Sequence, residues 1–300
     1  MTDMNKKAFL YIIIAGILWG TSGIFVHYLS PYGFTAFQMT GVRAIVSFAC
    51  IALYALIKDR KAFRVKPLQL LLFAGIGASL FFTAGCYYLS MQMTSVSTAV
   101  VLMYTAPIYV MICSVLFFGE TLTRGKLVSI AAMLIGCCLV SGVIGGLKFD
   151  AVGMLIGVLS GIAYAAYSIF TKIAMQKRID PMTATLYGFL FMSLISLFVL
   201  EPTRLVASIS AAPALTLPLL LGLGIFTFVV PYFLYTLAIK VLSAGVASSL
   251  GIIEPMCATL FGVVLFREPM DLFSVLGIVL ILGATYWIGK AESTATNQKT

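Results

Sequence analysis

Long apolar segments of about 20 residues follow one another along almost the whole chain and constrain its fold more than any other feature. Inside a bilayer a chain must satisfy its own backbone hydrogen bonds, which leaves helical bundles and closed barrels as the available folds. The segments lack the alternation of apolar and polar residues that is typical of barrel strands. The sequence therefore predicts an all-α polytopic membrane protein.

Composition supports this class and excludes a soluble protein. Of the 300 residues, 61% are hydrophobic and 10% are charged, whereas a soluble domain carries about 25% charged residues. The net charge of +9 does not indicate nucleic-acid binding, because the basic side chains lie between apolar segments without interleaved aromatics. All six cysteines lie within apolar segments, so we interpret them as packing residues and expect no metal site or cofactor.

Ten candidate transmembrane spans of roughly 18–25 residues can be assigned. Their approximate limits are residues 8–28, 34–57, 67–89, 95–118, 125–144, 152–175, 183–200, 213–238, 243–266 and 271–289. The first span is too long for the apolar part of a signal peptide, so we expect it to stay as a membrane helix. The connecting loops are short, and residues 291–300 are expected to form a polar cytoplasmic tail.

The basic residues predict the orientation of the chain. Fifteen of the 19 Lys and Arg side chains lie on loops of one side, and only Lys148, Arg204 and Arg267 lie on the other. Cytoplasmic loops carry an excess of Lys and Arg. Both termini are therefore expected in the cytoplasm, which requires an even number of spans. The protein itself is expected in the cytoplasmic membrane of a cell.

An internal repeat appears when the chain is shifted by 148 residues. Nine of 34 aligned positions are then identical, among them Pro107 with Pro255 and Glu120 with Glu268. The shift is about half the length of the chain, so the two copies divide it into two halves.

Each half holds five of the expected spans, in residues 1–148 and 149–290. An odd number of spans forces the second half to insert upside down relative to the first. Inverted repeats of this kind are a recurring design of secondary transporters, with the solute site between the halves near the bilayer midplane.

No motif of a soluble enzyme or of an ATP-driven pump is present, so we expect neither an enzyme nor a primary transporter. The single histidine, His27, cannot form a His-rich metal site and is interpreted as an interfacial side chain. A transporter of this composition must use gradients.

Two prolines occupy corresponding places near the middle of their spans. Pro107 and Pro255 each lie about 12 residues into a span. A proline within a helix removes a backbone hydrogen bond and bends the helix, which frees a carbonyl at membrane depth. Paired interruptions in two halves indicate a transporter binding site, although a kink used only for packing is the alternative.

Two ionisable residues are expected deep in the membrane. Arg43 lies roughly 14 Å from the outer end of its span and Glu254 roughly 16 Å from the inner end of its own. Isolated charges at that depth are costly and should face the interior of the bundle with a partner. They are interpreted either as groups that bind solute or couple protons, or as a structural ion pair; Arg43 bonded to carbonyls is a third possibility.

Polar aromatic residues are expected at a similar depth. They are Trp19, Tyr104, Tyr164 and Tyr167. Because Trp and Tyr prefer the membrane interfaces, their place in mid-span indicates a lined cavity. Taken singly, each of them fits slightly better as a large core residue, whereas the set together indicates the cavity.

Glycines at intervals of four residues predict close approach of helices. Gly16 and Gly20 form one such stripe, and Gly153, Gly157 and Gly161 form another. Because these helices open the two halves, we expect them to cross near the pseudo-two-fold axis.

Several segments together resemble the EamA family of the drug/metabolite transporter superfamily over nearly the whole chain. They are W-G-T-S from Trp19, G-V-R at Arg43, T-A-P and I-E-P at the two prolines, F-F-G-E-T-L around Glu120, and L-F-R-E-P around Glu268. The resemblance implies a ten-helix bundle of two EamA repeats. It also implies a central cavity lined by helices one, three, four, six, eight and nine, and export of amino acids or other small metabolites.

The leading hypothesis is a secondary exporter of amino acids or related metabolites that works by alternating access. The expected partners are a small-molecule solute, the lipid bilayer and protons as a candidate coupling ion. The expected site consists of Trp19, Arg43, Tyr104, Pro107, Tyr164, Tyr167, Glu254 and Pro255. Uptake of metabolites, efflux of lipophilic cations, a membrane-embedded enzyme and a structural subunit are the alternatives.

Overall fold

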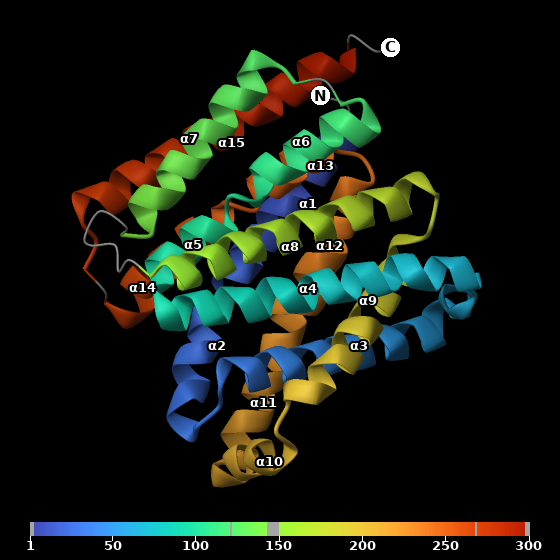
Figure 1. The fold of residues 1–300 in the computed structure, drawn as a ribbon, viewed down its shortest axis with the longest axis vertical. Helices are drawn as coiled ribbons and strands as arrows, with labels where there is room; N and C mark the ends of the chain where they lie inside the picture. The colour runs from blue at the N-terminus through green and yellow to red at the C-terminus, as the bar shows by residue number, and fades with distance from the viewer. Residues whose placement is uncertain (1–2, 121, 143–149, 268, 298–300) are drawn as a thin grey trace.

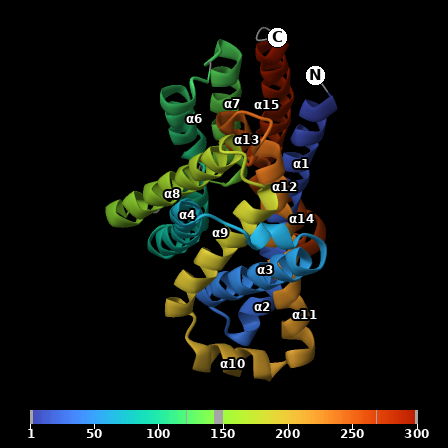
Figure 2. The ribbon, with the colours of Figure 1, turned by 90° about the vertical axis from the view of Figure 1, so that its right-hand side faces the viewer.

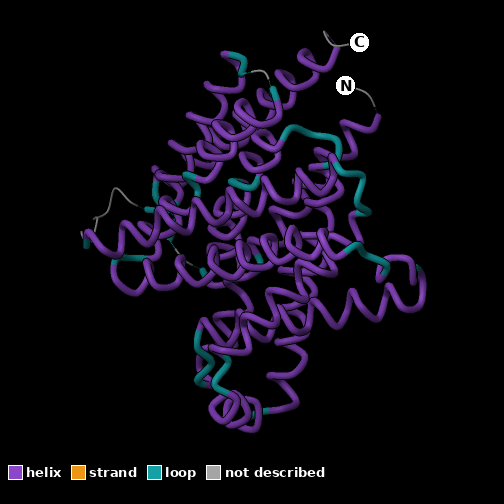
Figure 3. Tube along the Cα trace, turned by 45° about the vertical axis from the view of Figure 1, so that its right-hand side comes forward, coloured by secondary structure: helices purple, strands orange, loops and turns teal. Residues whose placement is uncertain are grey.

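The computed structural model describes residues 3–120, 122–142, 150–267 and 269–297, and all regular structure in these ranges is helical (Figures 1 and 3). Lys148, Glu268 and Lys299, on which parts of the orientation and repeat predictions depend, lie outside the described residues. The helices up to residue 142 are α1 (Asp3–Gly20), α2 (Ser22–Leu29), α3 (Ala36–Lys58), α4 (Pro67–Met93), α5 (Val96–Met103), α6 (Ala106–Phe118) and α7 (Arg124–Val140). The helices from residue 150 on are α8 (Ala151–Gln176), α9 (Pro181–Ser196), α10 (Pro202–Ala211), α11 (Pro213–Gly224), α12 (Val230–Ile239), α13 (Ala244–Leu250), α14 (Ile253–Phe266) and α15 (Leu272–Asn297).

Nine helical stretches of the described chain are long and apolar enough to cross a membrane. They run over Met4–Tyr32, Ala36–Lys58, Pro67–Met93, Val96–Phe118, Ala151–Gln176, Pro181–Val199, Pro213–Ile239, Ala244–Phe266 and Leu272–Lys290. The span expected at 125–144 corresponds to α7, whose 17 residues rise about 26 Å, less than the ~30 Å of the apolar layer. The all-helical membrane class is confirmed, whereas the count of ten spans stays a prediction.

Four of the expected spans are each built from two helices. The first is interrupted where the hydroxyls of Thr21 and Ser22 donate to the carbonyls of Leu18 and Trp19, in competition with the helical bonds. The eighth contains a π-helical turn, Ile225–Val229, between α11 and α12. The fourth and ninth are the α5–α6 and α13–α14 pairs, whose breaks are described below.

A short surface helix, α10, was not expected. It follows Glu201, whose backbone is left-handed (φ 45°), and begins with Pro202, a residue that favours the first turn of a helix. Of its ten residues only Ser208 is buried. At ten residues it is too short to cross a bilayer.

The helices form a bundle in which elements from both halves interleave. α4 and α8 lie side by side and run in opposite directions across the middle of Figure 1. α7 and α15 form an antiparallel pair at one end of the long axis, while α10 and α11 lie at the other end (Figures 1 and 2). The start of α1 and the end of α15 lie on the same side of the bundle (Figure 1).

One large buried cluster forms the core and draws on nearly every helix, from Ala8 in α1 to Ile288 in α15. The outside of the bundle carries large apolar side chains, such as Phe198 and Leu68, which are 91% and 78% exposed. In water such a surface would aggregate, but against lipid tails it is favourable. The burial pattern thus agrees with a multi-pass membrane protein.

Candidate functional site

Two helices are broken at corresponding positions in the chain. α5 ends at Met103 and α6 begins at Ala106, while α13 ends at Leu250 and α14 begins at Ile253. The shift of 148 residues found in the sequence maps the first break onto the second. Corresponding elements therefore stop and restart within one residue of matching positions.

The prolines lie just after these breaks and not within continuous helices. Pro107 is the second residue of α6 and Pro255 the third of α14. In the first turn of a helix the missing N–H would have had no helical partner, so proline fits there without disrupting the helix. The expected bend of one continuous helix is therefore wrong in its local form, because each span restarts as a new helix.

The two breaks meet through a hydrogen bond between halves. Tyr104, the residue after α5, donates its hydroxyl to Oε2 of Glu254 over 2.6 Å. The ring of Tyr164 on α8 stands edge-on to that of Tyr104, with 6.5 Å between centroids. Three of the predicted site residues are thus brought together, and the deep acid has a partner as expected of a charge in the membrane.

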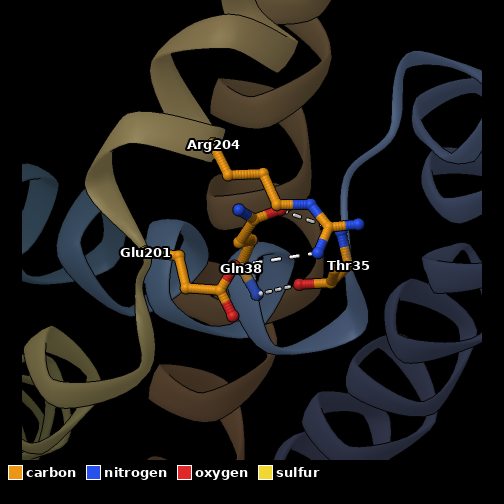
Figure 4. A network of polar contacts seen from close by, with 4 residues as sticks. All are labelled: Thr35, Gln38, Glu201 and Arg204. Carbon is orange, nitrogen blue, oxygen red and sulfur yellow. Dashed lines mark hydrogen bonds and ion pairs between the residues drawn. The ribbon is translucent and has the colours of Figure 1, made fainter.

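A capping box fixes the residue at which α3 begins (Figure 4), and with it the distance of Arg43 from the start of that helix. Thr35 Oγ1 accepts from the backbone N–H of Gln38, and Gln38 Oε1 accepts from that of Thr35. Beside this cap, Arg204 and Glu201 form an exposed ion pair of 3.7 Å. Arg43 lies seven residues beyond the first residue of α3, about 11 Å along the helix.

Arg43 and Glu254 do not form an ion pair, although both are described residues. The guanidinium of Arg43 instead lies over the ring of Phe228, 4.4 Å from its centroid, and donates to Thr40 Oγ1 over 3.4 Å. Its buried Nε meets no acceptor in the described chain. The structural-pair interpretation therefore has no direct contact to support it.

An aromatic cluster surrounds the remaining predicted residues. The ring of Trp19 stands edge-on to Tyr232 at 5.1 Å, and Tyr167 stands edge-on to the same ring at 5.4 Å. Phe228 packs against Tyr232 at 4.7 Å and so links Arg43 to the cluster. Tyr235 lies within 6 Å of both Trp19 and Tyr167.

A small cavity opens beside this cluster. It is lined by Ile76, Leu80, Tyr167, Thr171, Ala184, Thr185, Gly188, Phe189, Tyr232 and Thr236. Its volume is about 10 Å³, close to the room that one water molecule requires. Of the eight predicted site residues, only Tyr167 lines it, and the α9 residues on its wall were not expected there.

Three residues at the centre of the aromatic cluster were not predicted from the sequence: Phe228, Tyr232 and Tyr235. The available signal was Pro231, a third proline in the middle of a span. A proline clashes with the carbonyl four residues earlier, and the π-helical turn immediately precedes it. Such turns frequently occur at functional sites.

The glycine stripes of α1 and α8 allow close approach of other helices, as predicted, but the two stripes do not contact each other. A Cβ on Gly20 would lie 2.7 Å from Cys257 Cβ and 3.1 Å from the carbonyl oxygen of Glu254. A Cβ on Gly161 would lie 2.9 Å from the carbonyl oxygen of Leu102. The expected crossing of the two stripes is therefore wrong: each packs against the broken helix of the other half.

Comparison with known proteins identifies the family. The model of the EamA-like transporter family matches residues 6–142 and again residues 151–290. The chain belongs to the EamA-like transporter family. The two matches together cover nearly all of it.

Relatives of this EamA protein are named as transporters without a stated solute. An uncharacterized transporter of Archaeoglobus fulgidus is 30% identical over 273 residues, which cover 90% of this chain and 92% of the relative. Another from Clostridium kluyveri is 27% identical, over 98% of this chain and 95% of the relative. A solved crystal structure shares the fold, with a TM-score of 0.79 at 18% identity over 97% of this chain and 99% of that one.

Proposed function

We propose that this EamA protein is a secondary transporter that exports amino acids or related small metabolites across the cytoplasmic membrane by alternating access. One observation carries the proposal: two helices broken at corresponding places in the two halves are joined at their breaks by the Tyr104–Glu254 hydrogen bond. Discontinuous helices in corresponding positions are where transporters of this architecture bind solute and coupling ion.

The proposed architecture is ten spans in two inverted five-helix repeats, residues 1–148 and 149–290, with both termini in the cytoplasm. In support, a shift of 148 residues maps α4 onto α11–α12 and α7 onto the first part of α15. The family model matches once in each half. The start of α1 and the end of α15 lie on the same side (Figure 1), which favours an even number of crossings with α7 as one of them.

The proposed site unites the acid and the aromatic cluster. Glu254 binds and releases the coupling proton: it lies at the start of α14, just after the break, and accepts from the hydroxyl of Tyr104 in the other half over 2.6 Å. Trp19, Tyr164, Tyr167 and Arg43 contact the solute. Pro107 and Pro255 set the two breaks that allow the halves to move.

The small cavity supports a moving site. A ligand site has a volume of about 300–1,000 Å³, far more than the 10 Å³ beside Tyr167. Solute binding therefore requires the rings on α8 and α12 to separate, which is the motion that alternating access demands.

Efflux of lipophilic cations is the second candidate, favoured by aromatic rings close to a buried acid. The guanidinium of Arg43 lies against Phe228 in the same cluster, and its positive charge repels a cationic solute. We therefore place this candidate below export of amino acids.

Flux measurement on the reconstituted protein tests the proposal. Proteoliposomes loaded with a panel of radiolabelled amino acids and other small metabolites are diluted into buffer with and without a pH gradient. We expect protein-dependent efflux of at least one amino acid, accelerated by the gradient. Efflux of a lipophilic cation alone would favour the second candidate, and no protein-dependent flux of any solute would contradict transport.

A further inference from the structure

Two charged side chains from distant parts of the chain hold the turn between α12 and α13. Lys172 of α8 donates from Nζ to the carbonyl oxygens of Ile239 over 3.1 Å and of Leu242 over 2.7 Å. Glu120, just after α6, accepts at Oε1 from the backbone N–H of Ala244 over 3.1 Å. The turn is thus tied to both halves of the molecule.

The signs of both charges match the helix ends that they bind. Lys172 lies at the carboxyl end of α12, where the helix dipole favours a cation, and Glu120 lies at the amino end of α13, where it favours an anion. The receiving residues Ile239, Leu242 and Ala244 are almost fully buried. Charge-assisted hydrogen bonds shielded from water are stronger than exposed ones.

The contacts of Lys172 and Glu120 with the α12–α13 turn lie next to the cavity beside the aromatic cluster. Thr171 and Thr236 line that cavity on α8 and α12. Lys172 follows Thr171 directly, and Ile239 lies three residues after Thr236, about one helical turn. The contacts of Lys172 therefore join α8 and α12, the two helices whose rings must separate. They lie at the end of the bundle that carries Lys177 and Lys240, here called the basic end.

The corresponding turn of the first half is held differently. A shift of 148 residues pairs Lys172 with Ile24, an apolar residue that cannot donate. At the α4–α5 turn, Thr94 donates its hydroxyl to the carbonyl of Ser90 over 2.7 Å, and Ser95 accepts from the N–H of Thr98 over 3.1 Å. Among the described residues, neutral, local bonds hold this turn, whereas charged bonds between elements hold the other. Glu268, which the shift pairs with Glu120, lies outside the described residues.

We propose that Lys172 and Glu120 form a latch that holds the protein closed at its basic end and shifts the balance of alternating access toward the state that opens at the opposite end. The proposal rests on the proposed function, because a latch matters only where two such states exchange. Lys172 acts here as a positioning residue: it orders the α12–α13 turn and has no assigned contact with solute.

Side-specific labelling tests the latch. A reporter cysteine replaces Thr185 on the cavity wall, in a chain whose six native cysteines are changed to serine, and a charged, membrane-impermeant methanethiosulfonate is applied to one face of the vesicles at a time. Lys172→Met keeps the length of the side chain and removes the donor. We expect it to raise the labelling rate from the basic end about tenfold or more, because two charged hydrogen bonds are lost, and to lower the rate from the other end.

Two further variants separate the latch from a general loss of packing. Lys172→Arg restores a cationic donor and should return the ratio of the two rates to that of the parent. Lys177→Met removes an exposed cation at the end of the same helix and should leave the ratio unchanged. An unchanged ratio in Lys172→Met, or an equal rise from both faces, would overturn the proposal.

Glu120→Gln provides a second arm if Lys172→Met does not fold. It weakens the bond to Ala244 and should shift the ratio in the same direction by about threefold; no shift in that variant also overturns the latch. Solute flux through the same vesicles separates the two proposals. A ratio that responds in a protein that moves no solute contradicts transport and leaves the latch standing.

Discussion

The two broken helices share a backbone plan but not a chemistry. α5–α6 and α13–α14 stop and restart within one residue of equivalent positions, and both end in a left-handed residue, Gly119 in the first and Arg267 in the second. Where the second carries Glu254, the first carries Ala106. Where the first carries Tyr104, the second carries Ile252. One copy supplies the acid and the other its hydroxyl partner.

Burial separates the two copies further. All seven residues of α13 are buried, whereas in α5 only Thr98 and Ala99 are. The helices that follow do not differ in this way: Leu116 and Phe117 of α6 are exposed, and so are their counterparts Val264 and Leu265 of α14. The difference lies before the break: α13 is in the interior, whereas α5 is only partly buried. The two copies thus have different roles: the more buried copy carries the carboxyl of Glu254, and the other copy positions that carboxyl through the hydroxyl of Tyr104.

The largest expected effect comes from removing the acid that only one copy carries. Glu254→Gln preserves the size of the side chain and its contact with Tyr104 but cannot exchange a proton. We expect it to fold and to lose the pH-gradient-dependent part of solute flux in proteoliposomes. Gradient-driven flux at the parent rate would show that Glu254 does not couple protons.

Moving the acid to the other copy sharpens this test. In a double Ala106→Glu, Glu254→Ala variant the new carboxyl lies at the equivalent backbone position, but Ile252 offers it no hydroxyl. We expect no recovery of gradient-driven flux. Recovery would mean that the two copies are interchangeable and would break the comparison.

The next effect concerns the glycines that let the first helix of one half pack on the broken helix of the other. Gly20→Ala and Gly161→Ala each place a methyl group against backbone atoms that have little room to move, and each should lower the free energy of unfolding by about 3 kcal/mol. Thermal unfolding of the purified protein in detergent measures this loss. Gly23→Ala is the control, because a Cβ there meets nothing within 4 Å; a loss of equal size in the control would rule out the packing explanation.

A smaller effect is expected from the hydroxyl that joins the two breaks. Tyr104→Phe removes the 2.6 Å bond to Glu254 and should cost about 1.5–2 kcal/mol of unfolding free energy, because a buried carboxyl loses a donor. Tyr164→Phe removes a hydroxyl from the neighbouring ring without breaking a bond to Glu254. If both variants lose stability equally in the same unfolding assay, the bond between the breaks has no special weight.

The smallest effects are expected where the two broken helices end. Both Gly119 (φ 61°) and Arg267 (φ 58°) are left-handed, a conformation that favours glycine. Gly119→Ala should cost about 1 kcal/mol and Arg267→Gly should gain a similar amount. Opposite shifts of the midpoint of thermal unfolding would support equivalent caps, and shifts of the same sign would contradict them.

Sequence patterns predicted what depends on neighbours along the chain. Apolar length gave the membrane class and most helix limits, and the paired Pro107 and Pro255 marked both breaks to within three residues. The place of Glu254 far from either end of the Ala244–Phe266 stretch also followed from counting residues along its span. These features depend on hydrogen bonding and helical rise, which are local.

The partners of the site residues were not predictable in this way. Glu254 binds Tyr104 and not Arg43, and Arg43 lies over Phe228, because the rotation and crossing of whole helices decide which side chains meet. Depth alone cannot distinguish two residues at the same level. The π-helical turn before Pro231 rotates Phe228 and Tyr232 relative to a regular helix, so counting residues from the span end could not place them.

The packing of α1 has a consequence for the order in which the chain assembles. The contacts of Gly20 lie on α14, with Cys257 and Ala258, and α1 also packs along α12. Synthesis proceeds from the N-terminus, and more than 200 residues separate Gly20 from these partners, so α1 is made well before them. Until then its glycine face lacks the partners that it has in the complete structure.

The halves are consequently not separate folding units. A domain in the folding sense has a core of its own, whereas here one buried cluster runs through both copies. A chain truncated before α14 lacks the helix on which Gly20 of α1 packs. A half expressed alone likewise lacks the surface that its first helix contacts in the full chain. The core of this protein can therefore form only when the helices of both halves are present.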